Sequence, residues 1–312
     1  MSLITVSKLG RMGRFGNQMF QYSFLRAYAS RYQCDYQSPT WVGQWLFGLT
    51  DPPLKAKLPE YHERRHPAPR ESVFGQPIAP SDDSVCGHDY IGYCQFHTSW
   101  YQPQRQMLRE ILTPLKSIVA PLDQVINELT EGHARDLIGV HLRRGDTGRL
   151  IYYLTPNEWY LSWLEKNWGR FRNPILFIAT EQDSDVSAFA EYSPVVSKSL
   201  VTLQRKPYSI YNYLRYDLRS PTESTMDWFP DWYVLSQCPV MAIGESTFSF
   251  SAAMYGKCHE LWRSVLSRQD FESIDPWNAW PLVREDLRDF PGIPNTSLDS
   301  NPKWHGGEVC PR

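Results

Sequence analysis

Three apolar runs, far apart in the chain, constrain its fold most strongly. They are Leu137–Val140, Ile175–Thr180 and Val240–Ile243. A strand that is buried on both faces of a parallel sheet reads as a continuous apolar run of this kind. Because helical patterns separate the runs, the sequence predicts an α/β fold in which helices cover both faces of a parallel sheet.

Start signals for three helices lie between and after these runs. The order Thr155-Pro156-Asn157-Glu158 has capping-box spacing with Pro at the first helical position. Asp231 is the expected cap of a short helix that ends at Gln237, and a further helix is expected over Ser246–Tyr255.

The N-terminus repeats the order of strand, loop and helix with which an α/β domain begins. We expect a strand over Leu3–Lys8, a glycine loop over Gly10–Gly16 and a helix over Asn17–Tyr32, with Asn17 as its N-cap. Residues 39–84 are rich in Pro, Trp and charge and are expected to be irregular. A strand over Tyr90–Phe96 and helices over Met107–Leu112 and Leu122–Leu129 complete this half.

Charge and composition exclude several classes of protein. The net charge of −2 leaves no basic surplus for general nucleic-acid binding. The six cysteines form no CxxC pair, the N-terminus lacks the apolar core of a signal peptide, and no apolar stretch is long enough to span a membrane. We therefore expect a cytoplasmic protein. Aromatic residues make up 14% of the chain, which suits either core packing or sugar binding.

The segment His141–Asp146 is the first candidate for chemistry. Alternation along the strand puts Ile138, Val140 and Leu142 on one face, and Gly139, His141 and Arg143 on the other. Arg143 lies near the carboxyl end of the strand, where open α/β sheets bind ligands. A guanidinium group at this position can bind a phosphate through paired hydrogen bonds. An ordinary Arg–Asp ion pair that closes a turn is an equal alternative.

Two further segments combine a loop with a helix start. Gly13–Gln18 offers glycines and free N–H groups to an anion, although a tight structural loop explains it better when taken alone. Ser246–Ser249 could hold a diphosphate, and simple N-capping is the alternative.

Four segments, taken in order, resemble known fucosyltransferases. His141–Asp146 (HLRRGD) resembles the HxRRGD signature of the α1,2-, α1,6- and protein O-fucosyltransferases. Gly13–Tyr22, Gly92–Gln95, and Asp231–Cys238 together with Ser246–Ser249 resemble the GRxGNQxFQY, GYxQ and D-xxx-LSxC…STFS segments of the bacterial-type α1,2-fucosyltransferases. The four segments span most of the chain.

The resemblance implies a GT-B-like fold, with two Rossmann-like halves facing across a cleft. It implies an N-terminal, acceptor-side α/β domain over 1–135, a GDP-fucose-binding domain over 136–285 and a tail over 286–312. The implied reaction is inverting, metal-independent transfer of L-fucose from GDP-fucose to a glycan hydroxyl, with an α1,2 linkage to a galactose-terminated acceptor.

The resemblance also assigns roles to residues. Arg143 would hold the β-phosphate, His141 and Asp231 the guanine or its ribose, and Thr247 and Ser249 the diphosphate, while Arg14 and Asn17 reach across from the N-terminal half. The implied catalytic residues are Arg143, Asn17 and Asp146. The implied GDP-fucose-binding residues are Arg14, Gly16, Asn17, His141, Arg143, Thr180, Asp231, Ser246, Thr247, Phe248 and Ser249. No metal ligand and no cofactor are implied.

The chain departs from the family at Thr147, at Phe250-Ser251 and at Thr180-Glu181-Gln182, and this leaves the acceptor and linkage more open than the donor. The general base is open among Asp146, Glu223, Asp227 and Glu245.

Three rival hypotheses compete with this one. His62–His66 matches the HExxH pattern of a zinc hydrolase, through His62, Glu63 and His66, but lies in a Pro-rich stretch. Asp183 and Asp185 could form the DxD of a metal-dependent glycosyltransferase, although carboxylates at a helix start explain them better. The third is a catalytically inactive sugar-binding protein of the same fold.

Overall fold

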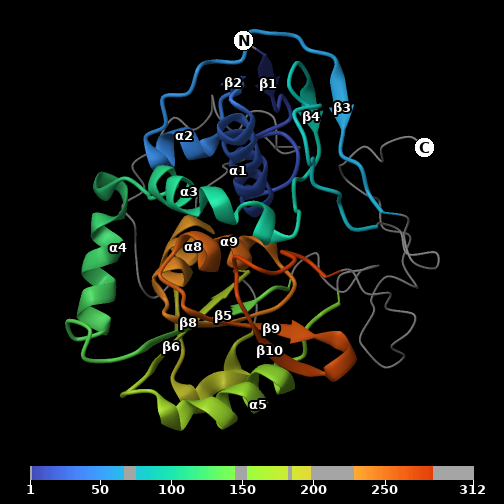
Figure 1. The fold of residues 1–312 in the computed structure, drawn as a ribbon. Helices are drawn as coiled ribbons and strands as arrows, with labels where there is room; N and C mark the ends of the chain where they lie inside the picture. Colours follow the sequence, from blue (N-terminus) through green and yellow to red (C-terminus); the bar gives the residue numbers. More distant parts are fainter. Residues whose placement is uncertain (1, 67–74, 145–152, 182–184, 198–227, 284–312) are drawn as a thin grey trace.

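The computed structural model describes residues 2–66, 75–144, 153–181, 185–197 and 228–283. Two sheets, parallel except for one strand pairing, organise this part of the chain (Figure 1). The N-terminal sheet has the strand order β2-β1-β4-β3 and all its pairings are parallel. Its strands are β1 (Leu3–Thr5), β2 (Asp35–Gln37), β3 (Glu60–His62) and β4 (Asp89–Ile91).

The larger sheet has the strand order β10-β9-β8-β5-β6-β7. Only the pairing of β10 with β9 is antiparallel in the described sheet. Its strands are β5 (Leu137–Leu142), β6 (Ile175–Thr180), β7 (Val195–Val196), β8 (Val240–Ile243), β9 (Glu260–Val265) and β10 (Asp270–Ile274). The three apolar runs of the sequence are β5, β6 and β8, so the predicted α/β fold with a covered parallel sheet is confirmed.

Helices cover the larger sheet on both faces. Helices α8 (Trp228–Gln237) and α9 (Thr247–Tyr255) lie between this sheet and the N-terminal half, and α5 (Asn157–Asn167) covers the opposite face (Figure 1). The side chains of Ile138, Val140 and Leu142 belong to the apolar cluster on the α5 side. Gly139 faces α8, where a Cβ atom would meet Cys238 and Leu235. The predicted alternation along β5 is therefore confirmed.

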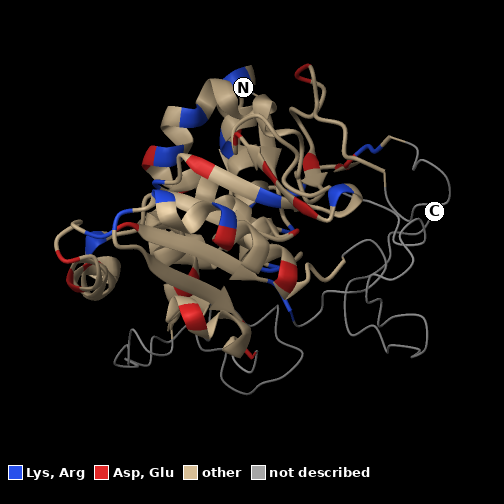
Figure 2. Cartoon of the chain, turned by 90° about the horizontal axis from the view of Figure 1, so that it is seen from below, with Lys and Arg blue, Asp and Glu red and all other residues tan. Residues whose placement is uncertain are grey.

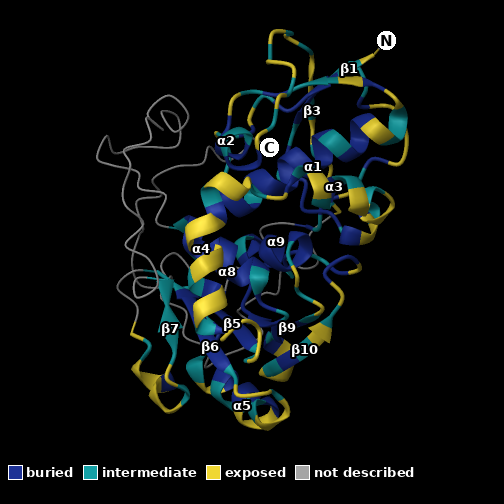
Figure 3. Cartoon of the chain, turned by 90° about the vertical axis from the view of Figure 1, so that its left-hand side faces the viewer, coloured by how far each residue is buried: buried dark blue, intermediate teal, exposed yellow. Residues whose placement is uncertain are grey.

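The N-terminal half is built around α1 (Phe15–Tyr32). Figure 3 shows α1, α8 and α9 largely in the buried colour, whereas α4 carries a continuous exposed face. One apolar cluster extends from α1 across α8 and α9 to the larger sheet, so the two halves share a core. Among the described residues, the remaining α-helices are α2 (Val42–Phe47), α3 (Arg105–Ile111) and α4 (Lys116–Leu129). The 3₁₀ helices are η1 (Thr98–Trp100), η2 (Gln102–Gln104), η3 (Trp168–Arg170), η4 (Ser187–Tyr192) and η5 (Leu266–Arg268).

A segment after β10 returns to the N-terminal half. Ala279 and Thr98 exchange hydrogen bonds: the Thr98 N–H donates to the Ala279 carbonyl at 2.8 Å, and the Ala279 N–H donates to the Thr98 hydroxyl at 3.0 Å. The indole of Trp277 is buried and donates to the Met254 carbonyl at the end of α9. The segment after β10 therefore provides a second set of contacts between the two halves.

Several predicted helix starts are wrong. Asn17 is not the N-cap of α1, because the helix begins at Phe15 with extended Arg14 before it. Thr155 does not cap α5; its hydroxyl bonds Ser264 on β9 at 3.0 Å, and α5 begins after extended Pro156. Asp231 lies inside α8 rather than at its cap.

The region 39–84, expected to be irregular, contains α2 and β3. Figure 2 shows basic and acidic residues mixed along the described chain, in keeping with the small net charge. None of the described helices is both long and apolar enough to cross a membrane.

Candidate active site at the junction of α1 and α9

Helices α1 and α9 pack side by side in a parallel arrangement. Gly16 lies against Thr247 and Phe248, Phe20 contacts Phe250 with ring centroids 6.3 Å apart, and the Ser23 and Tyr255 hydroxyls are 2.6 Å apart. The contacts advance along both helices in the same direction, so both N-termini lie at the same end.

Gly16 allows this close approach. A Cβ atom on Gly16 would lie 2.5 Å from the backbone nitrogen of Phe248 and 2.6 Å from the carbonyl carbon of Thr247. Backbone atoms cannot yield as a flexible side chain can. Gly16, which was expected to contact a ligand, therefore contacts the start of α9.

Asn17 joins three of the four segments that the sequence singled out. Its side-chain oxygen accepts hydrogen bonds from the Gln95 amide and from the Thr247 hydroxyl, each at 2.8 Å. Gly13 is required beside it: its φ of +78° is left-handed, and a Cβ atom there would lie 2.3 Å from the Asn17 amide nitrogen. The loop is closed by Gln18, whose amide donates to the Gly13 carbonyl at 3.1 Å.

His141 connects β5 to α9. Its Nδ1 lies 2.8 Å from the Ser249 hydroxyl, and its ring lies against Phe248 with centroids 5.5 Å apart. The side chain is buried. Burial, with smaller contributions from the positive charges of Arg143 and Arg144, lowers the pKa of His141 to about 3. The imidazole is therefore neutral near pH 7 and can accept as well as donate a hydrogen bond.

The two arginines after β5 have different partners. Arg143 donates from Nη1 to the Glu245 carbonyl at 2.9 Å, which holds its guanidinium beside the start of α9. Arg144 donates from Nη1 to the Thr155 carbonyl at 3.0 Å and from Nη2 to Asn157, and its N–H donates to Glu181 at 2.8 Å. Arg144, which the sequence left without a role, thus anchors the end of β5 to the start of α5.

Thr180 and Ser246 satisfy local backbone groups. The Thr180 hydroxyl donates to the Leu142 carbonyl at 2.9 Å, joining the carboxyl ends of β5 and β6. Ser246 is the N-cap of α9 and accepts from the Phe248 N–H at 3.3 Å. The N-capping alternative for Ser246 is therefore confirmed.

Asp231 is a largely buried carboxyl group near Glu181. Burial raises the pKa of Asp231 to about 7; the Glu181 charge adds to the rise, and a hydrogen bond with Ser197 opposes it. In the described chain its Oδ1 is buried without a hydrogen-bond partner. A polar ligand that reached this oxygen would satisfy it.

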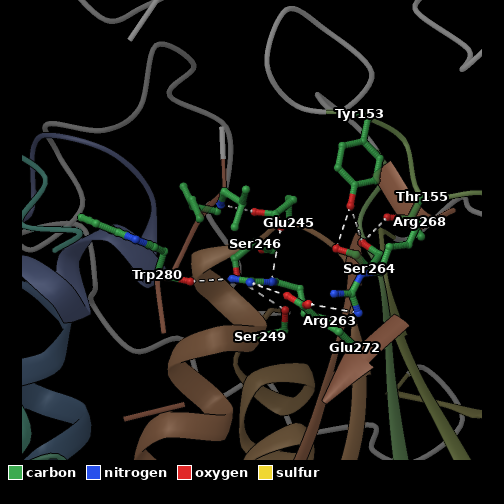
Figure 4. Close-up of polar contacts among 12 residues, drawn as sticks. Tyr153, Thr155, Glu245, Ser246, Ser249, Arg263, Ser264, Arg268, Glu272 and Trp280 are labelled. Carbon is green, nitrogen blue, oxygen red and sulfur yellow. Dashed lines mark hydrogen bonds and ion pairs between the residues drawn. The ribbon is translucent and has the colours of Figure 1, made fainter. Parts of the chain in front are cut away.

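A buried ion network supports the loop that leads into α9 (Figure 4). Glu245 and Arg263 form an ion pair at 3.8 Å, and Arg263 also donates to Glu272 at 3.0 Å and to the Trp280 carbonyl at 2.7 Å. The other carboxylate oxygen of Glu245 accepts from the Val283 N–H at 2.8 Å. The sequence named Glu245 among possible general bases, but these contacts make it a structural anchor. Arg263 was missed because no local pattern marks it.

The electrostatics of the junction favour an anion. Each helix N-terminus carries a partial positive charge. Neither α1 nor α9 has an acidic residue in its first turn to offset that charge. Arg14 precedes α1, and Arg143 lies at the start of α9. Two parallel helix starts and two guanidinium groups can bind a diphosphate.

The HExxH segment does not meet the requirement for a zinc site. His62 ends strand β3, and the residues after it are extended rather than helical. Glu63 accepts from the Cys94 N–H at 2.6 Å and pairs with Arg65 at 2.5 Å. A zinc site of this type needs both histidines on one helix face, so the structure does not support the zinc hypothesis.

Of the remaining candidate metal ligands and general bases, the structure describes only some. Asp185 accepts from the N–H and the hydroxyl of Ser187 at the start of η4, as the non-metal alternative expects. Asp146, Asp183, Glu223 and Asp227 lie outside the described residues, as does Thr147.

Comparison with known proteins identifies the fold. No protein-family model matches the chain, and no curated protein matches it. Among solved structures, a crystal structure of fucosyltransferase NodZ from Bradyrhizobium aligns with a TM-score of 0.50 and 14% identity, over 88% of this chain and 98% of that one. The chain has this GT-B-like fold.

Two related structures are also similar. A second structure of fucosyltransferase NodZ from Bradyrhizobium has a TM-score of 0.49 at 14% identity, with the same coverage. NodZ α-1,6-fucosyltransferase soaked with GDP-fucose has a TM-score of 0.47 at 14% identity, over 88% of this chain and 99% of that one. At this identity the likeness concerns the fold. The predicted fold class is confirmed, whereas membership of the α1,2 family stays a prediction.

Proposed function

We propose that this protein is an inverting glycosyltransferase that moves L-fucose from GDP-fucose to a hydroxyl group of a glycan without a metal ion. The observation that supports it best is the meeting of two helix N-termini beside Arg143, with Asn17 bonded to both Gln95 and Thr247. The fold, shared with a fucosyltransferase, agrees with this proposal.

The diphosphate of GDP-fucose binds at the junction of α1 and α9. Departure of GDP places negative charge on the β-phosphate, and Arg143 neutralises that charge in place of a metal ion. A preorganised charge of this kind is usually the largest single contribution to catalysis. Thr247 and Ser249 bind the same phosphates, and Arg14 approaches them from the N-terminal half.

His141 and Asp231 bind the nucleoside. The neutral imidazole of His141 is held by Ser249, and the buried Oδ1 of Asp231 accepts or donates a hydrogen bond depending on its protonation. Transfer proceeds through an oxocarbenium-like fucosyl carbon that the acceptor hydroxyl attacks from the opposite face. Asp146 is our candidate for the general base. An α1,2 linkage to a galactose-terminated acceptor rests on the sequence resemblance.

Thermal stability with nucleotides tests the donor. A ligand at a hundred times its dissociation constant stabilises a protein by about 2.7 kcal/mol. For a chain of this size the midpoint should rise by roughly 4 °C. We expect this rise with GDP and GDP-fucose, in EDTA as well as without it, and a smaller rise with UDP. A rise that disappears in EDTA would refute the metal-free site, and no rise with any nucleotide would refute the proposed donor.

A further inference from the structure

A pocket separate from the proposed donor site lies where the N-terminal half meets the segment after β10. It has a volume of about 320 Å³, and the residues that line it include Phe96, His97, Ser99, Trp100 and Trp280. Ile78 at its edge is 38% exposed, one of the few large apolar side chains of the described chain that reach solvent.

The walls of this pocket combine aromatic faces with hydrogen-bonding groups. Trp280 and Trp100 are half-buried, and the His97 ring stands edge-on to Trp280 with centroids 5.3 Å apart. The Nδ1 of His97 lies 2.8 Å from the Ser99 hydroxyl. A sugar ring has apolar C–H faces and a rim of hydroxyl groups, so it matches the half-buried indole of Trp280 beside imidazole and hydroxyl groups.

The pocket is preformed. Its two walls come from segments 181 residues apart, and the hydrogen bonds between Thr98 and Ala279 fix them to each other. Trp100 is held by its own donation to the Pro80 carbonyl at 3.0 Å and by Arg31 over its ring at 4.2 Å. A site whose walls are already ordered loses less entropy when a ligand binds.

Both segments that line the pocket are connected by short contacts to residues of the proposed donor site. Gln95, which donates to Asn17, is two residues before His97, and two residues span at most about 7 Å of chain. The Trp280 carbonyl accepts from Arg263, whose partner Glu245 in turn accepts from Arg143 through its backbone carbonyl. The pocket is thus connected through both of these segments to residues of the proposed donor site.

We propose that the pocket lined by His97 and Trp280 binds a saccharide unit of the acceptor, next to the unit that receives fucose. The assignment rests on the proposed function for its role, but the binding of a saccharide here can be measured separately.

The test is binding of the intact protein, saturated with GDP, to an array of immobilised oligosaccharides that end in galactose, N-acetylglucosamine, glucose or mannose. The variants are His97→Ala and Trp280→Ala, with Trp280→Phe to retain an aromatic face. Trp168→Ala is the matched control, because Trp168 is also half-buried and lines a different pocket of about 400 Å³, beside Tyr192.

We expect His97→Ala and Trp280→Ala to reduce saccharide binding at least tenfold, and Trp280→Phe and Trp168→Ala to keep most of it. The GDP-induced rise in melting temperature should be unchanged in all four variants. Wild-type binding levels in both alanine variants, or no retention of any oligosaccharide by the wild type, would overturn the assignment. If GDP does not stabilise the wild type, the donor proposal fails, and the array still reports on the pocket.

Discussion

The side-chain oxygen of Asn17, in the third position of α1, accepts a hydrogen bond from the Thr247 hydroxyl, the first residue of α9, at 2.8 Å. The two residues are 230 positions apart and belong to different halves of the molecule. Gln95 donates to the same oxygen from a third segment. This hydrogen bond therefore links the two halves of the molecule beside the proposed diphosphate site.

Asn17→Ala and Thr247→Val should each destabilise the protein by about 1–3 kcal/mol, because each leaves a poorly hydrated polar group without its partner. The double variant should lose less than the sum, with a coupling of about 0.5–3 kcal/mol. Denaturant unfolding of the four proteins measures this coupling. Strictly additive losses would show that the bond contributes nothing to the junction.

Gly16→Ala should force α1 and α9 apart, since its Cβ atom would meet backbone atoms of Thr247 and Phe248. Overpacking of this kind costs about 1–3 kcal/mol. The stabilisation by GDP should fall as well. Gly169→Ala is the control, because a Cβ atom there has nothing within 4 Å. Thermal unfolding with and without GDP distinguishes the two, and equal behaviour would contradict the close contact.

Arg143→Ala should lower kcat by about 100- to 1,000-fold, the usual loss when a preorganised donor to developing charge is removed. Arg143→Lys keeps the charge but not the paired donors, and should recover only part of the rate. Arg172→Ala removes an exposed guanidinium and should be neutral. Rates of fucosyl transfer by the purified variants test this, and an Arg143→Ala rate near half of wild type would exclude the phosphate role.

Asp231→Asn should change how stability depends on pH. The folded pKa of Asp231 is about 7, above its usual value near 4, so the folded state holds this proton where the unfolded state has lost it. The stabilisation that Asp231 contributes to the folded state is fully present below about pH 4, and it is lost as the pH rises to about 7. Relative to wild type, Asp231→Asn should therefore become more stable from pH 4 to pH 8 in urea unfolding.

The contribution of His141 to stability should rise with pH, the opposite of Asp231, so a His141 variant provides a check on that experiment. Its folded pKa of about 3 lies below its usual value near 6.5, so the unfolded state binds the extra proton between these values. Its contribution to stability is present above about pH 6.5 and is lost as pH falls toward 3. His141→Asn should lessen the acid sensitivity of the protein, and an unchanged acid transition would contradict a buried neutral imidazole.

Arg263→Ala should leave the buried Glu245 carboxylate without its cation, at a cost of roughly 3–5 kcal/mol. Arg170→Ala removes an ion pair with Glu260 that is partly exposed, and should cost about 0–1 kcal/mol. Comparing their unfolding midpoints tests the anchoring role of Arg263. Similar losses in both variants would mean that the Glu245 network does not support the loop before α9.

Much of the fold was predictable because local burial leaves a local pattern. The strands at 137–142, 175–180 and 240–243 are apolar runs, since both faces of the larger sheet are covered. Helix starts were less predictable. Asn17 and Thr155 have the chemistry of caps, but the structure uses both side chains for contacts with distant segments.

The sequence by itself determined the α/β architecture and the facing of β5, because apolar runs and strand alternation depend on residues a few positions apart. It offered the capping of α9 by Ser246 only as an alternative to diphosphate binding. Only the tertiary structure decided that α1 and α9 run parallel with their N-termini together, that Asn17 binds Thr247, and that Glu245 pairs with Arg263. These contacts join residues between 18 and 230 positions apart across helices and strands, and no periodicity along the chain encodes which distant partner a polar side chain will meet.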